Sequence, residues 1–260
     1  MSQFELGPDL DKRLRDSINN EGDFLANLGF ILALLNESVI APNPLFSVEV
    51  MEHAALPIFT TESDLEIFLT DIQMPEGVIW NTVPISAFWS NLMESPIDTV
   101  TFNPKTAADV QTGNLYFFDK IKLNDFLQSH SEMMNQVMSA ENEEAPFEQK
   151  SYFVPTLIGS RMYGDIIRVF PMIMAPDKKT YVPIFDNLLS LSMWYRNEEL
   201  VKYFKDNDGQ FRAMKLNELL HPSLGENRFG ETAGIVVNPL NFDPKEDQSN
   251  MHTWEELDKL

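Results

Sequence analysis

Apolar positions along the chain follow two spacings, one typical of helices and one of strands. Between Asp23 and Leu35 they recur three, four and seven residues apart, which predicts an amphipathic helix. A second helix is predicted to begin after Thr61, because Thr61 and Asp64 have the spacing of a capping box, and a third is predicted at 85–92. Short apolar runs ended by proline or turn residues predict strands at 38–42, 47–51, 55–59, 78–80 and 99–102.

The second half of the chain repeats this order of elements with longer connections. An amphipathic helix is predicted over 123–138, an acidic loop over 141–148 and a strand over 152–154. Further strands are predicted within 161–174 and at 182–185. This mixture of helices and short strands predicts an α+β fold for both halves.

Three short motifs occur twice, in the same order. Ala41-Pro42 recurs as Val154-Pro155, Pro57-Ile58-Phe59 recurs as Pro183-Ile184-Phe185, and Asn103-Pro104 recurs as Asn238-Pro239. Repetition in one order indicates duplication, so the sequence predicts two tandem similar domains, each a small mixed sheet packed against helices. The Asn-Pro pairs lie farther apart than the Pro-Ile-Phe segments, which places an insertion near 187–195 in the second copy.

Changes in composition set the expected domain boundaries. A polar, turn-like stretch ends the first copy, and after Phe242 the chain becomes polar and acidic, with Trp254 as its one aromatic anchor. We therefore expect a first domain at 1–112, a second domain with insertions at 113–245 and an acidic C-terminal tail at 246–260.

The composition is that of a folded protein without thiol chemistry. Hydrophobic residues make up 43% and charged residues 23% of the 260 positions, and there is no cysteine. Disulfide scaffolds, thiolate metal sites and cysteine nucleophiles are thereby excluded. The apolar run Leu28–Leu35 is far shorter than the roughly 20 residues that span a bilayer, and the N-terminal residues lack a signal-peptide core. A cytoplasmic protein with no membrane partner is expected.

The net charge of the chain limits which classes of macromolecule are expected to bind it. The formal net charge is −21, and between Arg15 and Lys120 the only lysine or arginine is Lys105. Nucleic acids and anionic membranes require clusters of cations, so neither is expected to bind. Two interpretations remain: the charge keeps the protein in solution, or it forms an acidic face for a basic protein partner.

No arrangement of reactive side chains indicates a catalytic, cofactor-binding or metal site. The segment around Ser160 lacks the spacing of a nucleophile elbow, and the loop Gly225–Gly230 lacks the lysine of a phosphate-binding loop. Asp206-Asn207-Asp208-Gly209 predicts a tight turn with Gly209 at positive φ, rather than a calcium loop. Metal-binding spacing is also absent among the four histidines, which are His53, His130, His221 and His252. No cofactor is expected.

The repeated motif positions are the remaining candidates for a shared role. They are Pro57, Phe59, Asn103 and Pro104 in the first copy, and Pro183, Phe185, Asn238 and Pro239 in the second. An asparagine that closes a strand binds either a ligand or the local backbone, while the following proline ends the strand. The structural role is favoured, and Phe59 and Phe185 are expected to be core anchors.

The order of these motifs resembles the SseB family, named for enhanced serine sensitivity. Pro57-Ile58-Phe59-Thr60 fits the family's segment, whereas Pro183-Ile184-Phe185-Asp186 departs at its last position. The resemblance covers two copies, roughly 14–106 and 121–242. It implies α+β domains with helices against a sheet and a bacterial cytoplasmic setting, and it carries over no catalytic residues.

These observations favour a non-catalytic cytoplasmic protein-interaction or accessory module over an enzyme. A protein partner, basic if the acidic face is functional, is expected, and the two copies are expected to form a monomer with pseudo-symmetric repeats. The alternative is a small-molecule-binding protein or enzyme with a pocket at the junction of the two repeats.

Overall fold

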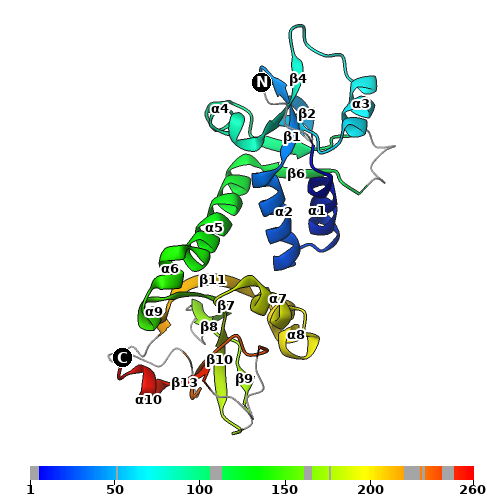
Figure 1. Ribbon diagram of the computed structural model, residues 1–260. Coiled ribbons are helices and arrows are strands. Elements are labelled where there is room, and N and C mark those ends of the chain that lie inside the picture. Colours follow the sequence, from blue (N-terminus) through cyan, green and yellow to red (C-terminus); the bar gives the residue numbers. More distant parts are fainter. Residues whose placement is uncertain are drawn as a thin grey trace. The chain divides into compact units, whose positions relative to one another are not determined.

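The computed structural model divides the chain into two compact units, Met1–His130 and Ser131–Leu260 (Figure 1). It describes residues 6–50, 52–105, 113–160, 166–175, 177–219, 229, 232–241 and 249–260. Both units combine helices with small sheets, so the predicted α+β fold class is confirmed. None of the helices within these ranges combines the length and the hydrophobicity needed to cross a lipid bilayer.

The described residues of the first unit form helices α1 to α4, the 3₁₀ turn η1, strands β1 to β6 and the beginning of α5. The helical elements are α1 (Pro8–Asn19), α2 (Phe24–Asn36), α3 (Glu62–Asp71), η1 (Ile85–Ala87), α4 (Trp89–Glu94) and α5 (Lys120–Met138). The strands are β1 (Ser38–Asn43), β2 (Val48–Val50), β3 (His53–Ile58), β4 (Ile79–Pro84), β5 (Thr99–Phe102) and β6 (Tyr116–Asp119).

Side-chain caps explain where three of these helices begin. Asp23 accepts a hydrogen bond from the backbone N–H of Ala26 at the start of α2. At the start of α3, Thr61 Oγ1 accepts from the backbone N–H of Asp64 at 3.1 Å, which confirms the predicted cap. Asp119 does the same for the first backbone N–H groups of α5.

The strands of the first unit form one four-stranded sheet and one two-stranded ribbon. The sheet has the order β2-β3-β5-β6, in which β3 and β5 are parallel and the other pairs are antiparallel. The ribbon pairs β1 with β4 in antiparallel register. A single antiparallel bridge between Ile40 and Phe59 joins the ribbon to the end of β3.

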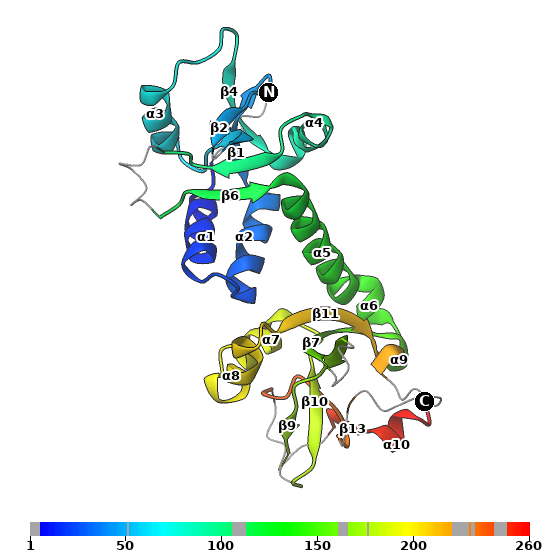
Figure 2. The ribbon, with the colours of Figure 1, turned by 180° about the vertical axis from the view of Figure 1, so that it is seen from behind.

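Among the described residues of the first unit, a larger and a smaller apolar cluster form the core. The larger lies between the sheet and helices α1, α2 and α5, which carry the buried residues Leu14, Ile31 and Leu123. Figure 2 shows α1 and α2 side by side beneath β6. The smaller joins the ribbon to α3, where the rings of Phe59 and Trp80 lie 5.3 Å apart, centroid to centroid.

The described residues of the second unit form the end of α5, further helical elements and strands β7 to β13. The helical elements are α6 (Ala140–Glu144), η3 (Phe147–Gln149), α7 (Leu188–Tyr195), α8 (Glu198–Asp206), α9 (Leu216–Leu219) and α10 (Trp254–Leu257). The strands are β7 (Ser151–Ser160), β8 (Ile166–Val169), β9 (Ile173–Met174), β10 (Thr180–Ile184), β11 (Gln210–Lys215), β12 (Gly234–Val237) and β13 (Met251–Thr253).

The strand pairings of the second unit correspond to those of the first. β10 and β12 are parallel, like β3 and β5, and β13 pairs antiparallel with β12, as β6 does with β5. β7 pairs antiparallel with β11, as β1 does with β4. The bridge between Phe153 and Phe185 occupies the place of the bridge between Ile40 and Phe59. Thus the same connections occur in the same chain order in both units.

The expected boundaries shift in the structure. β6 is hydrogen-bonded to β5, so the first sheet extends to Asp119, beyond the expected end at 112. Within the expected tail at 246–260, β13 joins β12 and Trp254 is buried, so these residues belong to the second sheet. Strands of three or four residues, such as β6 and β13, are too short to reveal a period in the sequence. Residues 106–112 and 242–248 lie outside the described residues.

Three local predictions are corrected. The expected acidic loop at 141–148 contains α6 and η3, because Ser139 caps α6 and its first-turn glutamates face a helix N-terminus that favours negative charge. The expected helix at 85–92 is instead η1 followed by α4. In the turn after α8 the residue with positive φ is Asp208 (52°), whereas Gly209 is needed because a Cβ atom there would overlap the ring of Phe204.

The insertion expected near 187–195 forms α7. Asn187 caps this helix by accepting from the backbone N–H of Ser190, and Trp194 near its end is fully buried. The indole contacts Phe185 and Phe204, with ring centroids 5.6 Å and 5.5 Å away. The second unit therefore places two packed helices, α7 and α8, after its Pro-Ile-Phe motif, where the first unit has α3 alone.

Candidate functional site

The two motif asparagines close corresponding strands in the same way. Asn103 has φ 46° and Asn238 has φ 51°, both in the left-handed region that asparagine tolerates better than most residues. The backbone N–H of Asn103 donates to Ile58 O at 2.8 Å, and that of Asn238 donates to Ile184 O at 2.9 Å. Each asparagine therefore ties the end of one parallel strand to its neighbour.

The asparagine side chains hold the residue that follows the Pro-Ile-Phe motif. Asn103 Oδ1 accepts from the backbone N–H of Thr60 at 2.8 Å, and Asn238 Oδ1 accepts from that of Asp186 at 3.3 Å. Asn238 Nδ2 also donates to Asp186 Oδ1 at 2.7 Å. These contacts lie within the fold, which is what a structural role requires.

The phenylalanines and prolines of the repeated motifs are buried at corresponding positions in the two units. Phe59 and Phe185 are fully buried, each at the bridge that joins the two sheets of its unit. The buried prolines lie inside β3 and β10 or directly after the motif asparagines, and they are Pro57, Pro104, Pro183 and Pro239.

A polar cluster, buried for the most part, surrounds Asn103 in the first unit. We define it as Asp11, Thr60, Asp64, Asn103, Lys105 and Asn114. Lys105 Nζ lies 2.5 Å from Asp64 Oδ1, and the two side chains are 0% and 6% exposed. Asn114 Nδ2 bridges both carboxylates, donating to Asp64 Oδ2 at 2.8 Å and to Asp11 Oδ1 at 2.7 Å. The cluster thus joins α1, α3 and the segment after β5.

Opposing effects act on the pKa of Asp11. Burial acts to raise the pKa of Asp11, but hydrogen bonds from Asn114, Arg15 and Thr60, together with the charge of Arg15, lower it overall. Thr60 Oγ1 donates to Asp11 at 2.7 Å, and Arg15 Nε lies 2.7 Å from the other carboxylate oxygen. These carboxylates are engaged by protein donors, so we assign the cluster a structural role.

Removing the Asn103 side chain should destabilise the first unit more than the matching change destabilises the second. Asn103→Ala leaves the buried N–H of Thr60 unpaired and places alanine at positive φ, which costs about 2–4 kcal/mol. Asn238→Ala should cost less, because its backbone partner is 3.3 Å away and Asp186 is exposed. Urea unfolding followed by tryptophan fluorescence measures both. Equal losses, or no loss at Asn103, would contradict this assignment.

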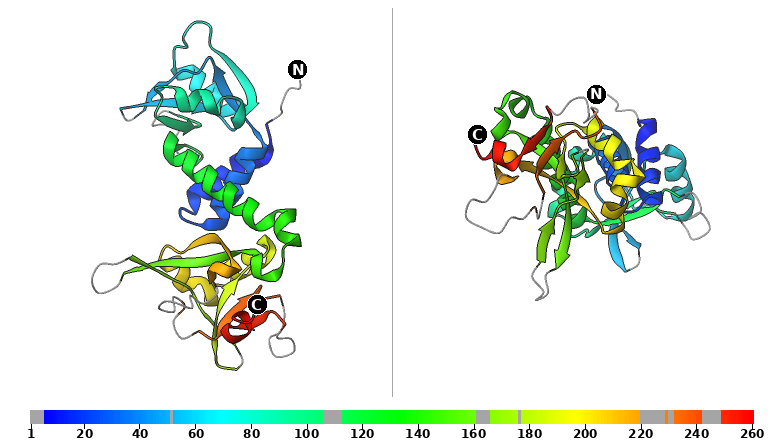
Figure 3. Two further views of the ribbon diagram at one scale, coloured as in Figure 1. Left: turned by 90° about the vertical axis from the view of Figure 1, so that its left-hand side faces the viewer. Right: turned by 90° about the horizontal axis from the view of Figure 1, so that it is seen from below.

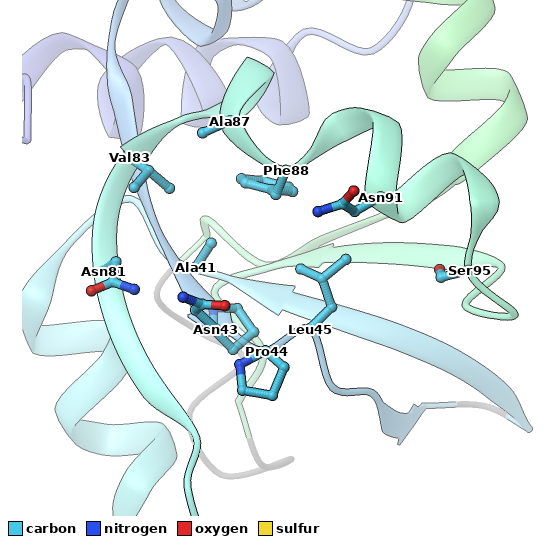
Figure 4. Close-up of a pocket in the computed structure, with 11 residues that line it drawn as sticks. Ala41, Asn43, Pro44, Leu45, Asn81, Val83, Ala87, Phe88, Asn91 and Ser95 are labelled. Atoms are coloured by element: carbon cyan, nitrogen blue, oxygen red, sulfur yellow. The ribbon is translucent and has the colours of Figure 1, made fainter.

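A groove of about 440 Å³ opens elsewhere on the first unit, between the β1–β4 ribbon and the η1–α4 segment (Figure 4). Its apolar lining includes Leu45 and Phe88, and the amides of Asn43, Asn81 and Asn91 point into it. We call it the asparagine groove. Its volume lies within the range of about 300–1,000 Å³ typical of ligand sites.

Strand alternation explains how one ribbon serves both a core and a groove. Side chains of a strand point alternately to opposite faces. Ile40 and Trp80 lie in the apolar cluster with Phe59, whereas Ala41 and Asn81, which are register partners, lie one position along and line the groove. One face of the ribbon therefore packs in the smaller apolar cluster, whereas the other packs in the larger cluster through Val39 and Ala41 and lines the groove beside it.

The asparagine groove lacks a charged lining residue, and its amides are unpaired. Within the described residues, neither Asn43, Asn81 nor Asn91 forms a hydrogen bond to another protein group through its side chain. Lys120 Nζ donates to three backbone carbonyls at the end of α4, among them that of the lining residue Ser95 at 2.7 Å. The amides are thus available to an incoming donor and acceptor.

The corresponding ribbon of the second unit does not carry these amides. Aligning the two bridges places Thr156 of β7 where β1 has Asn43, and Arg212 of β11 where β4 has Asn81. Thr156 is 4% exposed and donates to the backbone carbonyl of Gln210 at 3.2 Å. The ribbon therefore folds without asparagine at these positions, so the fold does not account for the amides of the first unit.

His53, His130 and His252 are not among the residues that line the groove. His130 packs between Phe24 and Phe126, and burial lowers the pKa of its imidazole. Burial likewise lowers the pKa of His252, and exposed His53 lies 3.3 Å from Asp98. His221 and most of the loop Gly225–Gly230 lie outside the described residues. Within those that are described, no three histidine or acidic side chains are grouped to hold a metal ion.

Comparison with known proteins adds little to this geometry. No family model and no curated protein matches the chain. Among solved structures, Tic22 from Plasmodium falciparum is matched at 12% identity over 77% of this chain and 89% of that chain, with a TM-score of 0.19. A similarity of that size supports no argument about fold or function.

The groove amides were not singled out by the sequence. Asn43, Asn81 and Asn91 belong to a strand end, a second strand and a short helix, and no spacing relates them. The one available signal is the comparison of the two halves of the chain, since Ala41-Pro42-Asn43 aligns with Val154-Pro155-Thr156.

Proposed function

We propose that this chain is a non-catalytic protein-interaction module, a tandem of two copies of one SseB-like α+β unit, whose first unit binds a basic partner. The matching strand pairings of the two units support the tandem arrangement. The motif order supports the resemblance to the SseB family.

One observation carries the proposal of a basic partner. Between Arg15 and Lys120 the only fixed cation is Lys105, and its side chain is 0% exposed because it is paired with Asp64. This long stretch therefore presents exposed carboxylates and has no accessible lysine or arginine of its own. A surface of one charge sign attracts partners of the opposite sign and raises their rate of association.

The test is an affinity purification in which the tagged full-length chain captures partners from the native lysate. It is repeated with two variants, each of which has the charge of three glutamates reversed in one of the two units. Lysine replaces three exposed glutamates of the first unit, Glu49, Glu66 and Glu94, or three of the second, Glu144, Glu199 and Glu255. We expect a stoichiometric partner that first-unit reversal abolishes, second-unit reversal spares and high salt releases. A lack of any partner at all salt concentrations, or equal effects of the two reversals, would contradict the proposal.

A further inference from the structure

The asparagine groove offers unpaired amides on an apolar floor, and this combination has a defined chemical complement. An asparagine side chain presents both an N–H donor and a carbonyl acceptor, which is the pair that a peptide bond also presents. Leu45 and Phe88 provide apolar surface beside these amides. A ligand that fits both must carry backbone-like polar groups along one side and small apolar groups along the other.

We propose that the asparagine groove binds an extended peptide segment of a basic protein, with Asn81 and Asn91 hydrogen-bonding to its main chain. This inference rests on the proposed function and specifies where and how the partner is held. Asn43, at the end of β1, contributes a third amide to the same groove (Figure 4).

The unpaired amides select an extended segment over a helix. A helix satisfies its own backbone N–H and C=O groups internally, so it leaves nothing along its length for the three amides to bind. An extended segment leaves these groups free, and recognition through main-chain hydrogen bonds is a common mode of peptide binding. Specificity would then come from the side chains that contact Leu45 and Phe88.

The negative charge near the groove favours a basic peptide over a neutral ligand with similar hydrogen-bonding groups. Glu94 is exposed and lies in the sequence between the lining residues Asn91 and Ser95. Because it follows Asn91 by three residues, it lies on the same side of α4 as Asn91. The ammonium group of Lys120 binds the carbonyls at the end of α4, but between Arg15 and Lys120 the only lysine or arginine is the buried Lys105, so carboxylates predominate in this part of the chain. A sugar would gain nothing from the carboxylate of Glu94, whereas lysine or arginine beside the bound segment would.

The experiment measures binding of one short peptide to the full-length chain by fluorescence anisotropy. The probe is acetylated and amidated, with lysines at both ends and small uncharged residues between them. Its first control has the same charge but N-methylated central amides, which removes the main-chain donors. Its second control carries glutamate in place of lysine.

Protein variants test the same contacts from the other side. Asn81→Ala and Asn91→Ala should each weaken binding of the probe about fivefold, and N-methylation should weaken it by a similar or larger factor. Gln73→Ala, an exposed amide outside the groove, should leave binding unchanged. Since neither groove amide is used by the fold, all three variants should keep the unfolding midpoint of the parent chain.

The outcomes separate this inference from the proposed function. If the lysine probe binds but neither N-methylation nor the asparagine variants weaken it, the peptide lies elsewhere and the groove assignment is wrong, while a basic partner still stands. If the lysine and glutamate probes bind equally, or neither binds at low salt, the basic partner is wrong as well. If a neutral oligosaccharide such as maltotriose binds instead and is lost in the asparagine variants, the groove is a sugar site and the peptide assignment fails.

Discussion

Replacing Lys105 by methionine should lower the free energy of unfolding of the first unit by about 3–5 kcal/mol. The side chain of Lys105 is 0% exposed and that of its partner Asp64 is 6% exposed, so the substitution leaves a buried carboxylate without its counter-charge. The ammonium group also donates to Asn114 Oδ1 at 2.8 Å, and that contact is lost too. Tryptophan fluorescence during urea unfolding measures the change.

Two further variants make the Lys105 result interpretable. Lys122→Met removes an exposed cation and should change stability by less than about 0.5 kcal/mol. Combining Lys105→Met with Asp64→Asn removes both charges while keeping a similar shape, so it should recover part of the loss. A single Lys105→Met variant as stable as the Lys122→Met control would show that the pair does not hold the cluster together.

Replacing Trp254 by alanine should destabilise the second unit by about 3–5 kcal/mol. Trp254 is 7% exposed, stacks on Phe229 at 4.9 Å between centroids and donates from Nε1 to Thr232 O at 2.8 Å. Its helix α10 (red in Figure 3) follows directly from β13, which pairs with β12. The C-terminal residues therefore complete the second core.

The control for Trp254 is its exposed neighbour on the same helix. Glu255 forms only a surface ion pair with Lys259, at 3.0 Å, so Glu255→Ala should cost less than about 1 kcal/mol. Truncation after Phe242 should be at least as damaging as Trp254→Ala, since it removes β13 as well. An unchanged melting temperature after either change would mean that this segment does not contribute to the core.

Much of the fold could be predicted because the spacing of apolar residues along the sequence shows where helices and strands form. The helix after Asp23 and the cap at Thr61 were predicted from residue spacing and are present. Helix α1 was not predicted, because its buried contacts come chiefly from Leu10 and Leu14 within an otherwise polar stretch. Too few apolar positions remain there to define a stripe.

The candidate site could be predicted far less well than the fold. The motif asparagines were found because they recur, and their contacts turn out to serve the backbone. The groove amides come from separate elements, and only the packing of the ribbon against α4 brings Asn81 and Asn91 to one surface. Likewise, the burial of Lys105 against Asp64, which removes from the surface the only lysine or arginine between Arg15 and Lys120, depends on tertiary contacts that no local pattern encodes.

The most direct test of the account is the nuclear magnetic resonance spectrum of the asparagine side-chain amides during titration with the lysine-ended peptide. The account predicts that the NH₂ signals of Asn43, Asn81 and Asn91 shift together, while those of Asn142 and Asn207, which hydrogen-bond within the second unit, stay in place. Shifts confined to other residues, or unchanged groove signals at saturating peptide, would contradict binding in the asparagine groove.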